Sequence, residues 1–339
     1  MKNLTPMLGA AAFAIGIASA AQAAAPLRLV AKYKMPPGIT GRFDHLGADL
    51  RGNRLFVAAE TAHKVLVFNL RSGKFIRAIG GIGIPHAIFC REDLNRIFVT
   101  DGGAGEVRIY DGKTYRQIGT VKLKVDADSI GYDPATHDLY VVNGGGDAHE
   151  TFSMLGVVNT TSDKKAGDIK IDGDTLEQMA LALSEPLLYI ENPSKSQVDV
   201  VNRRTRSIVA TWPITMGHRN VAIAFDPASQ RLFVACRSGV LVILDSKTGK
   251  QLQSLPIGKG VDDLIFDPHF KRIYASCGGG TGTVVVYHED SPNHYTLLGK
   301  IPSGPGGKNE VLVPRLDHLF VTIPPRGGTP GEVYVYDVR

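Results

Sequence analysis

Two stretches of the sequence, AFDPASQRLFVAC at residues 224–236 and IFDPHFKRIYASC at residues 265–277, share one pattern. In each stretch an apolar run ends in Asp-Pro, a short turn follows, and a second run begins with Arg and continues with aliphatic and aromatic residues. Asp-Pro favours a tight reversal of the chain, and runs of this composition favour β-strands. Each stretch is therefore predicted to form an antiparallel β-hairpin.

The hairpin pattern recurs along most of the chain. Seven copies align on the first apolar residue of their second strand, at Leu55, Ile97, Leu139, Leu188, Leu232, Ile273 and Leu319. The copies are 41 to 49 residues apart, a period typical of four-stranded propeller blades. Each second strand is followed by a third, and most copies then carry a more polar fourth, such as GKFIRAIG at residues 73–80. We therefore predict an all-β fold, a seven-bladed β-propeller of four-stranded blades.

The two ends of the repeat array complement each other. The last copy stops after its third strand, which ends in YVYDVR at residues 334–339. The stretch LRLVAKYKM at residues 27–35 has strand composition but belongs to no copy. An unpaired strand edge favours aggregation, and a closed ring removes it. We therefore predict that the N-terminal strand pairs with the last blade and closes the propeller.

The first 23 residues have the features of a secretory leader. Lys2 precedes an apolar run at residues 7–20, and Ala21-Gln22-Ala23 supplies the small residues that signal peptidase requires. We predict a signal peptide at residues 1–23, a single propeller domain at residues 24–339, and a periplasmic or secreted protein. No later window is apolar enough to span a membrane, so no membrane span is expected after cleavage.

Charge and cysteine content exclude several classes of protein. The chain has 38 Lys and Arg residues against 33 Asp and Glu, and the basic residues are scattered singly. Nucleic-acid binders concentrate them on one face, so no nucleic-acid partner is expected. The three cysteines, Cys90, Cys236 and Cys277, have no metal-ligand or CxxC spacing. Cys236 and Cys277 occupy equivalent positions in adjacent blades, and we predict them to be buried free thiols.

The two opening stretches resemble the repeat of bacterial YVTN propellers, in which an Asp-Pro turn precedes an Arg-aliphatic-aromatic-Val strand. The resemblance extends over residues 27–339, with departures where Ser-Glu-Pro replaces the turn at residues 184–186 and where the seventh copy lacks the Asp. It implies the propeller fold. Proteins of this kind include relatives of lactonases and lyases, so the resemblance implies no single chemistry, and function must be argued from a site.

In a propeller the first strand of each blade lines the central channel, and equivalent residues meet at one level around it. Alignment of the copies places at the channel mouth Asp44, His86, Asp128, Glu177, Val221, Asp262 and Asn309. Polar residues adjoin this level at His45 and Asn220 and at the ends of the second strands. The predicted ligand-binding residues are Asp44, His45, His86, Asp101, Asp128, Asn143, Glu177, Asn192, Asn220, Arg237, Asp262 and Asn309.

The residue types at the mouth suggest a specific chemistry. Ser, Thr or Lys side chains would keep a channel mouth hydrated equally well. Carboxylates and imidazoles also ligate cations and transfer protons, so their presence here favours one of these roles. His45, His86 and His218 are the candidate metal ligands, and one divalent metal ion is the candidate cofactor. The alternative is that the polar mouth only faces water. The pair His218 and Arg219 resembles the basic entrance of seven-bladed lactonases and supplies the candidate catalytic residues.

Two classes of function follow from this mouth. As a binding module, the propeller would present the ring to a small polar ligand, a metal ion or a periplasmic protein. As an enzyme, it would be a metal-assisted hydrolase or lyase, in which a cation polarises a carbonyl and a histidine accepts a proton. A third possibility is a redox-associated propeller that binds a quinone or haem, although the sequence contains no CxxCH motif.

Overall fold

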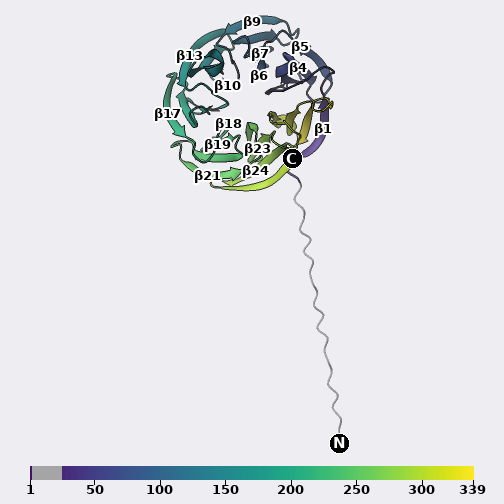
Figure 1. Cartoon of the computed structure of the whole chain (residues 1–339), viewed down its shortest axis with the longest axis vertical. Coiled ribbons are helices and arrows are strands. Elements are labelled where there is room, and N and C mark those ends of the chain that lie inside the picture. The colour runs from purple at the N-terminus through teal and green to yellow at the C-terminus, as the bar shows by residue number, and fades with distance from the viewer. Residues whose placement is uncertain (2–24) are drawn as a thin grey trace.

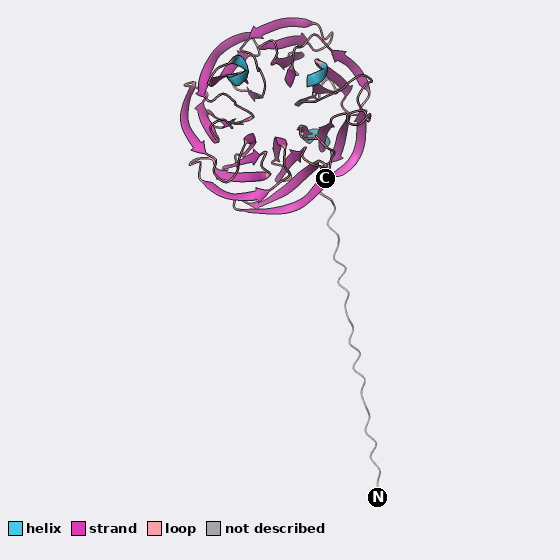
Figure 2. Cartoon of the chain, in the orientation of Figure 1, coloured by secondary structure: helices cyan, strands magenta, loops and turns pink. Residues whose placement is uncertain are grey.

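In the computed structural model, which describes residues 25–339 together with Met1, the chain forms a ring of seven four-stranded antiparallel sheets around a common axis (Figure 1). The predicted seven-bladed propeller is therefore confirmed. The predicted signal peptide at residues 1–23 lies outside the described residues, apart from Met1. Figure 2 shows that the ring is built almost entirely of strands. The short 3-10 helices are η1 (Glu60–Ala62), η2 (Gly145–Ala148) and η3 (Pro314–Leu316).

In blades 1 to 6 the strands run outward from the channel in sequence order. Blade 1 contains β2 (Leu46–Asp49), β3 (Arg54–Ala59), β4 (Lys64–Asn69) and β5 (Phe75–Ile79). Blade 2 contains β6 (Pro85–Arg91), β7 (Arg96–Asp101), β8 (Glu106–Asp111) and β9 (Gln117–Lys122). Blade 3 contains β10 (Ile130–Asp133), β11 (Asp138–Gly144), β12 (Phe152–Asn159) and β13 (Lys164–Asp172). Blade 4 contains β14 (Met179–Ala182), β15 (Leu187–Asn192), β16 (Gln197–Asn202) and β17 (Ser207–Pro213).

The remaining three blades complete the ring. Blade 5 contains β18 (Asn220–Asp226), β19 (Arg231–Cys236), β20 (Val240–Asp245) and β21 (Gln251–Pro256). Blade 6 contains β22 (Val261–Asp267), β23 (Arg272–Cys277), β24 (Thr283–Ser291) and β25 (His294–Pro302). Blade 7 contains β26 (Glu310–Val313), β27 (His318–Ile323), β28 (Glu332–Asp337) and, as its outer strand, β1 (Arg28–Lys34).

The pairing of β1 with β28 confirms the predicted closure of the ring. The two strands run antiparallel, from the pair Arg28 and Asp337 to the pair Lys34 and Glu332, and they lie side by side in Figure 1. An ion pair of 2.6 Å joins Arg28 Nη2 to Asp337 Oδ2. The side chain of Tyr33 is buried, and its hydroxyl donates a hydrogen bond to the carbonyl of Leu70 in blade 1. The outer strand of blade 7 therefore also contacts blade 1.

The Asp-Pro turns are stabilised by hydrogen bonds from backbone amides to the Asp side chain. The Asp226 carboxylate accepts hydrogen bonds from the amides of Ala228 (2.9 Å) and Ser229 (3.0 Å), and Asp267 accepts one from the amide of His269 (2.9 Å). Such bonds replace backbone pairing within the turn. They hold the first two strands of blades 5 and 6 in register.

The apolar core is divided among the blade interfaces. Seven clusters of buried apolar side chains lie between neighbouring blades, one at each junction of the ring. The cluster between blades 7 and 1, for example, joins Phe320 to Leu55 and Tyr33. Cys236 and Cys277 are buried free thiols within such clusters, as predicted. Because the core lies between blades, the side chains at the channel mouth are left available for other roles.

Candidate functional site

The channel mouth is built where the inner strands of the blades begin. Backbone pairing continues upstream of the regular strands, because Asp44 N donates to Ala58 O and Asp128 N donates to Val142 O, each at 2.9 Å. In blade 2 the register of β6 shifts between Pro85 and Ile88, so His86 lies in a β-bulge. A bulge changes the direction of a side chain relative to the regular pleat. Similar register shifts occur at the start of β18 and β22, so the side chains at the start of these three inner strands can turn toward the axis.

Three consecutive blades bring together a cluster of possible metal ligands. One donor atom from each of Asp44, His86 and Asp128 lies within 4.8 Å of the others. His86 Nδ1 is 2.5 Å from Asp44 Oδ2 and 3.9 Å from Asp128 Oδ1. Asp128 Oδ1 is buried and has no hydrogen-bond partner in the described part of the chain. These residues form a polar triad whose geometry suits a metal ion.

His45 contacts the triad from one side. Its Nε2 atom lies 3.7 Å from Asp44 Oδ1 and 3.9 Å from Asp128 Oδ1, distances too long for hydrogen bonds. Its Nδ1 atom is 3.0 Å from Asp263 Oδ1. Metal-binding histidines usually donate their second ring N–H to a carboxylate in this way, which fixes the orientation of the ring. Asp263 therefore directs His45 Nε2 toward the triad.

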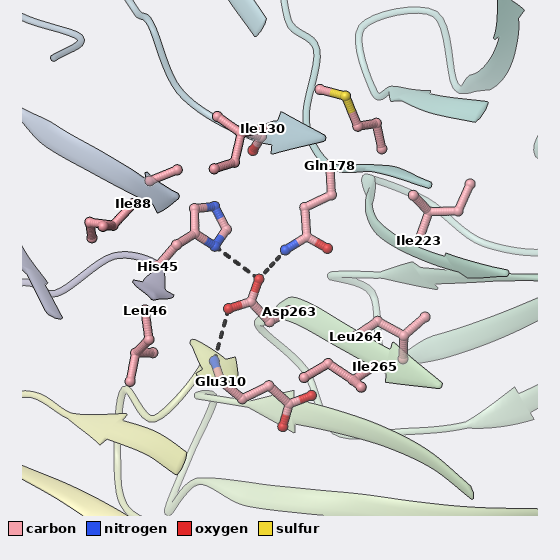
Figure 3. Close-up of a pocket in the computed structure, with 13 residues that line it drawn as sticks. His45, Leu46, Ile88, Ile130, Gln178, Ile223, Asp263, Leu264, Ile265 and Glu310 are labelled. Carbon is pink, nitrogen blue, oxygen red and sulfur yellow. Dashed lines mark hydrogen bonds and ion pairs between the residues drawn. The ribbon is translucent and has the colours of Figure 1, made fainter. Parts of the chain in front are cut away.

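Asp263 is held by two further contacts. The Gln178 amide donates to Asp263 Oδ1, and the backbone N–H of Glu310 donates to Asp263 Oδ2 at 2.8 Å. Figure 3 shows His45 and Gln178 reaching the Asp263 carboxylate from opposite sides. These contacts come from blades 1, 4 and 7, so the orientation of His45 depends on the whole ring.

Burial and charge act together on the ionisable groups of the triad. Burial opposes ionisation of Asp44, but the positive charges of His45 and His86 outweigh it and lower the pKa of Asp44 to about 2. Burial would lower the pKa of His86, but the negative charge of Asp128 and the hydrogen bond to Asp44 raise that pKa to about 9. Burial raises the pKa of Asp128 to about 7, despite the opposing charge of His86. At neutral pH Asp44 is therefore ionised, whereas His86 keeps its proton.

The other half of the mouth pairs two basic side chains with two carboxyl groups. Asp262 accepts hydrogen bonds from Lys308 Nζ (2.6 Å), from Arg237 Nη2 and from Asn309 Nδ2 (3.2 Å). Arg237 Nη1 also lies 3.4 Å from Glu177 Oε1. Burial raises the pKa of Glu177 to about 8, although Arg237 opposes the shift. Asn309 also donates to Asp44 at 3.3 Å and so links this half of the mouth to the triad.

Other predicted ligand-binding residues have structural partners instead. The Asp101 carboxylate accepts hydrogen bonds from the amides of Gly83 (2.8 Å) and Ile84 (2.9 Å). The Asn143 amide donates to the carbonyls of Val141 and Met154. Asn192 and Asn220 donate to the buried carboxylates of Asp199 and Glu191. All four side chains are buried and hold loops or strand ends in place.

His218 and Arg219 lie on the exposed loop between β17 and β18. Within the described residues, no ion pair joins either side chain to a carboxylate, and His218 is not part of the triad. Among residues 25–339 this pair forms hydrogen bonds through its own backbone atoms alone, such as His218 N to Ser238 Oγ at 3.2 Å. The structure therefore separates these two residues from His45 and His86.

Two contributors to the mouth were not among the predicted residues. Asp263 follows the aligned position of Asp262, and Lys308 precedes that of Asn309. Each is a charged residue next to a residue that the repeat alignment places at the channel mouth, and that position would have identified both. Glu177, Arg237, Asp262 and Asn309 were predicted, and they lie together opposite the triad.

Below the mouth lies a cavity of about 250 Å³. His45, Gln178, Asp263 and Glu310 form its polar wall, and aliphatic side chains of the inner strands line the rest (Figure 3). His45 belongs to both the mouth and the cavity. Within the described residues, no helix has the length and apolar character needed to cross a membrane.

Fold and mouth together define a seven-bladed β-propeller with a carboxylate and imidazole cluster at one end of its channel. Two curated relatives, each described as uncharacterized protein YncE, come from Salmonella typhi and Salmonella typhimurium (strain LT2). Both are 29% identical to this chain over 99 residues, a match that spans 29% of this chain and only 28% of each relative. No protein-family model matches the chain.

Solved structures show the same fold at low sequence identity. A chain in the crystal structure of the mitotic checkpoint complex superposes with a TM-score of 0.73 at 17% identity, over 97% of this chain and 98% of that chain. A chain of Kuenenia stuttgartiensis hydrazine synthase gives a TM-score of 0.71 at 15% identity, over 88% of this chain and 96% of that chain. At these identities the likeness extends to the fold alone.

Proposed function

We propose that this protein is an exported propeller of the YVTN type that binds one divalent transition-metal ion at its channel mouth. The ligands are Asp44, His86 and Asp128, with His45 as a fourth. The metal would be presented to a small polar ligand or to a periplasmic protein. The observation that carries the proposal is the buried Asp128 Oδ1, which has no hydrogen-bond partner in the described residues and faces two imidazole nitrogens at 3.9 Å.

These distances suit a cation. Two atoms that ligate one ion, each about 2.0–2.2 Å from it, lie roughly 3 to 4 Å apart. The separations of 3.7 and 3.9 Å around His45 Nε2 and Asp128 Oδ1 fall in that range. The direct contact between His86 and Asp44 would open as the ion replaced the shared proton. Mixed imidazole and carboxylate ligands favour Zn²⁺ and its neighbours over Ca²⁺ or Mg²⁺, which prefer oxygen ligands.

The competing explanation is that the cluster is a permanent network of ion pairs between carboxylates and protonated histidines. Metal analysis distinguishes the two. After chelation and buffer exchange, the purified protein should take up one equivalent of Zn²⁺ by isothermal titration calorimetry and elemental analysis. Asp128→Asn keeps the size of the side chain but removes its charge, and it should weaken binding by more than about 100-fold.

Two further variants make the test specific. Asp263→Asn alters the group that orients His45, leaves the four proposed ligands in place, and should weaken binding by about 10- to 100-fold. Asp147→Asn removes an exposed carboxylate on η2, outside the cluster, and is the matched control with unchanged affinity. Failure of the parent protein to bind any divalent metal, or equal affinity in Asp128→Asn, would leave the ion-pair network as the explanation.

A metal-assisted hydrolase or lyase is the second candidate, and one observation favours it. Glu177 is a buried carboxyl beside Arg237, and its raised pKa of about 8 would keep it protonated at neutral pH, as a general acid must be. Metal-dependent opening of a lactone that is lost in Glu177→Gln, with metal affinity unchanged, would support this reading. Metal binding without turnover would support the binding module.

A further inference from the structure

The cavity below the mouth has a chemical character different from the mouth itself. Its 250 Å³ are enclosed by residues from all seven blades, so it lies on the channel axis. The aliphatic part of the wall is contributed by Leu46, Ile88, Ile130, Met179, Ile223 and Leu264. These six come from six successive blades, so aliphatic side chains surround the axis at this level. Most of them are largely buried in the cores between blades, and polar groups supply more of the exposed wall.

The polar part of the wall has a defined hydrogen-bonding pattern. The Asp263 carboxylate only accepts hydrogen bonds when ionised, so Gln178 must present its NH₂ group to it. The amide oxygen of Gln178 then has no donor in the described residues and, in Figure 3, points away from Asp263. The Ser129 hydroxyl, also in the wall, has no side-chain hydrogen bond among the described residues. The cavity wall therefore contains a free acceptor and a free hydroxyl.

Neither ring nitrogen of His45 adds a free donor to the cavity. One faces Asp263, and the other faces the triad. The backbone N–H of Glu310 is also used by Asp263. A molecule that enters the cavity thus meets the Gln178 oxygen and the Ser129 hydroxyl, and the Glu310 carboxyl in the wall also has one oxygen, Oε1, without a partner in the described residues. A ligand that donates a hydrogen bond is complementary to this wall, whereas a carboxylate would find few donors and a neighbouring negative charge at Asp263.

The volume sets the size of the ligand. An aliphatic cavity of about 150 Å³ in a protein stays dry and binds benzene. A volume of 250 Å³ accommodates a six-membered ring together with a small head group. Ligand sites combine apolar wall surface with a few placed polar groups, and this cavity has both, with the polar part the larger.

We propose that this cavity is a second binding site, for a small molecule with an apolar body of about one six-membered ring and a single hydrogen-bond-donating head group. The head group, a hydroxyl or an ammonium, donates to Gln178 Oε1, and the body packs against the aliphatic side chains of the wall. The site is separate from the proposed metal site, because its walls contain none of Asp44, His86 and Asp128.

Three probes with the same ring test the proposal: cyclohexanol, cyclohexylammonium and cyclohexanecarboxylate. Methyl NMR spectra of chelator-treated protein, labelled at Ile and Met methyl groups, report on Ile88, Ile130, Met179 and Ile223. Cyclohexanol should shift these signals saturably, and the carboxylate should not. Shifts by the ammonium as well would assign the site to both head groups, and shifts by the alcohol alone would assign it to neutral donors.

Two variants test the location. Gln178→Met keeps the length of the side chain but removes the acceptor, and the loss of one neutral hydrogen bond should weaken binding roughly 2- to 12-fold. Ile130→Trp should fill the cavity and abolish binding. Ile118→Trp, on the exposed outer strand β9, is the matched control and should bind normally. Each variant is compared only if its melting curve shows that it is folded.

Several outcomes would overturn the proposal. One is the absence of saturable shifts with all three probes, and another is binding of the carboxylate as strong as that of the alcohol. A third is unchanged affinity in both Gln178→Met and Ile130→Trp. Because the experiment uses metal-free protein and methyl signals, a negative metal titration would not affect it, and failure here would leave the metal proposal intact.

Discussion

Glu191 is a buried ionisable residue that lowers the stability of the folded protein as pH rises. Its side chain is fully buried at the end of β15, Oε2 accepts a hydrogen bond from Asn220, and Oε1 has no partner in the described residues. Burial raises the pKa of Glu191 well above its ordinary value of 4.5, against the effect of the Asn220 hydrogen bond. The folded protein therefore holds a proton on Glu191 at pH values where the unfolded chain has released it.

This difference predicts how stability depends on pH. Above pH 4.5 the folded state binds more protons than the unfolded state, so the contribution of Glu191 to the free energy of unfolding falls as pH rises toward its folded pKa. Glu191→Gln carries no charge and should melt about 2–4 °C above the parent protein at pH 8, with a smaller gap at pH 5. Thermal melts across this range measure the gap. Glu185→Gln, an exposed residue of the same blade, should show none. A gap that did not change with pH would contradict the assignment.

At the mouth, the sequence predicted which residues share a level but not where each side chain points. The alignment placed Asp44, His86 and Asp128 at one level, and the structure brings them within 4.8 Å of one another. The same reasoning included Asp101, whose side chain turns to backbone amides of a neighbouring loop, and Asn143, whose side chain turns to backbone carbonyls of β11 and β12. Side-chain direction at a strand end depends on bulges and on local acceptors, and the repeat period contains neither kind of information.

Among the elements, β1 depends on a close contact with a glycine. Gly73, in the turn between β4 and β5, has a φ of +67°, and a Cβ atom built on it would lie 2.0 Å from Tyr33 Cδ1. Tyr33 is the residue of β1 that packs against Phe320, with ring centroids 6.1 Å apart. The turn of blade 1 therefore needs glycine both for its backbone conformation and for the space that Tyr33 occupies.

We expect Gly73→Ala to destabilise the protein by about 1–3 kcal/mol and to loosen β1. Denaturant melts measure the first effect, and faster proteolytic cleavage within β1 measures the second. Gly80→Ala is the matched control, because Gly80 lies in the next loop of the same blade and a Cβ atom there would meet no atom within 4 Å. If β1 were equally protected in both variants, the contact between Tyr33 and Gly73 would not hold the strand.

On the scale of the whole molecule, the proposal of export makes a prediction about the mature chain. The protein from its native host should begin at Ala24, because cleavage follows the small residues Ala21 and Ala23. Mass spectrometry of the intact protein and fractionation of the cells measure this. Ala23→Arg removes the small residue at the cleavage site and should leave the precursor uncut. An intact leader on the parent protein would contradict both the export and the periplasmic location.

The ring as a whole was more predictable than its mouth. Repeats anchored from Leu55 to Leu319 fixed the number of blades, and the orphan stretch at residues 27–35 identified how the ring closes. The number of blades and the way the ring closes both follow from strand composition and repeat period, and these can be read from short stretches of the sequence. The contact of His45 with Asp263 joins blades 1 and 6, and nothing local in the sequence encodes it. The cavity behind them was not predicted for the same reason.

Closure by β1 also affects how the chain folds during its synthesis. Arg28 and its partner Asp337 are 309 residues apart, so β1 emerges first and its partner strand almost last. At about 5–20 residues per second, synthesis of the intervening chain takes roughly 15 to 60 s. Throughout that interval β1 has no strand to pair with, and its backbone hydrogen-bonding groups are open to any other strand. The nascent chain is thus most prone to incorrect strand pairing at β1. A chaperone that bound β1 would prevent such pairing until blade 7 had been synthesised.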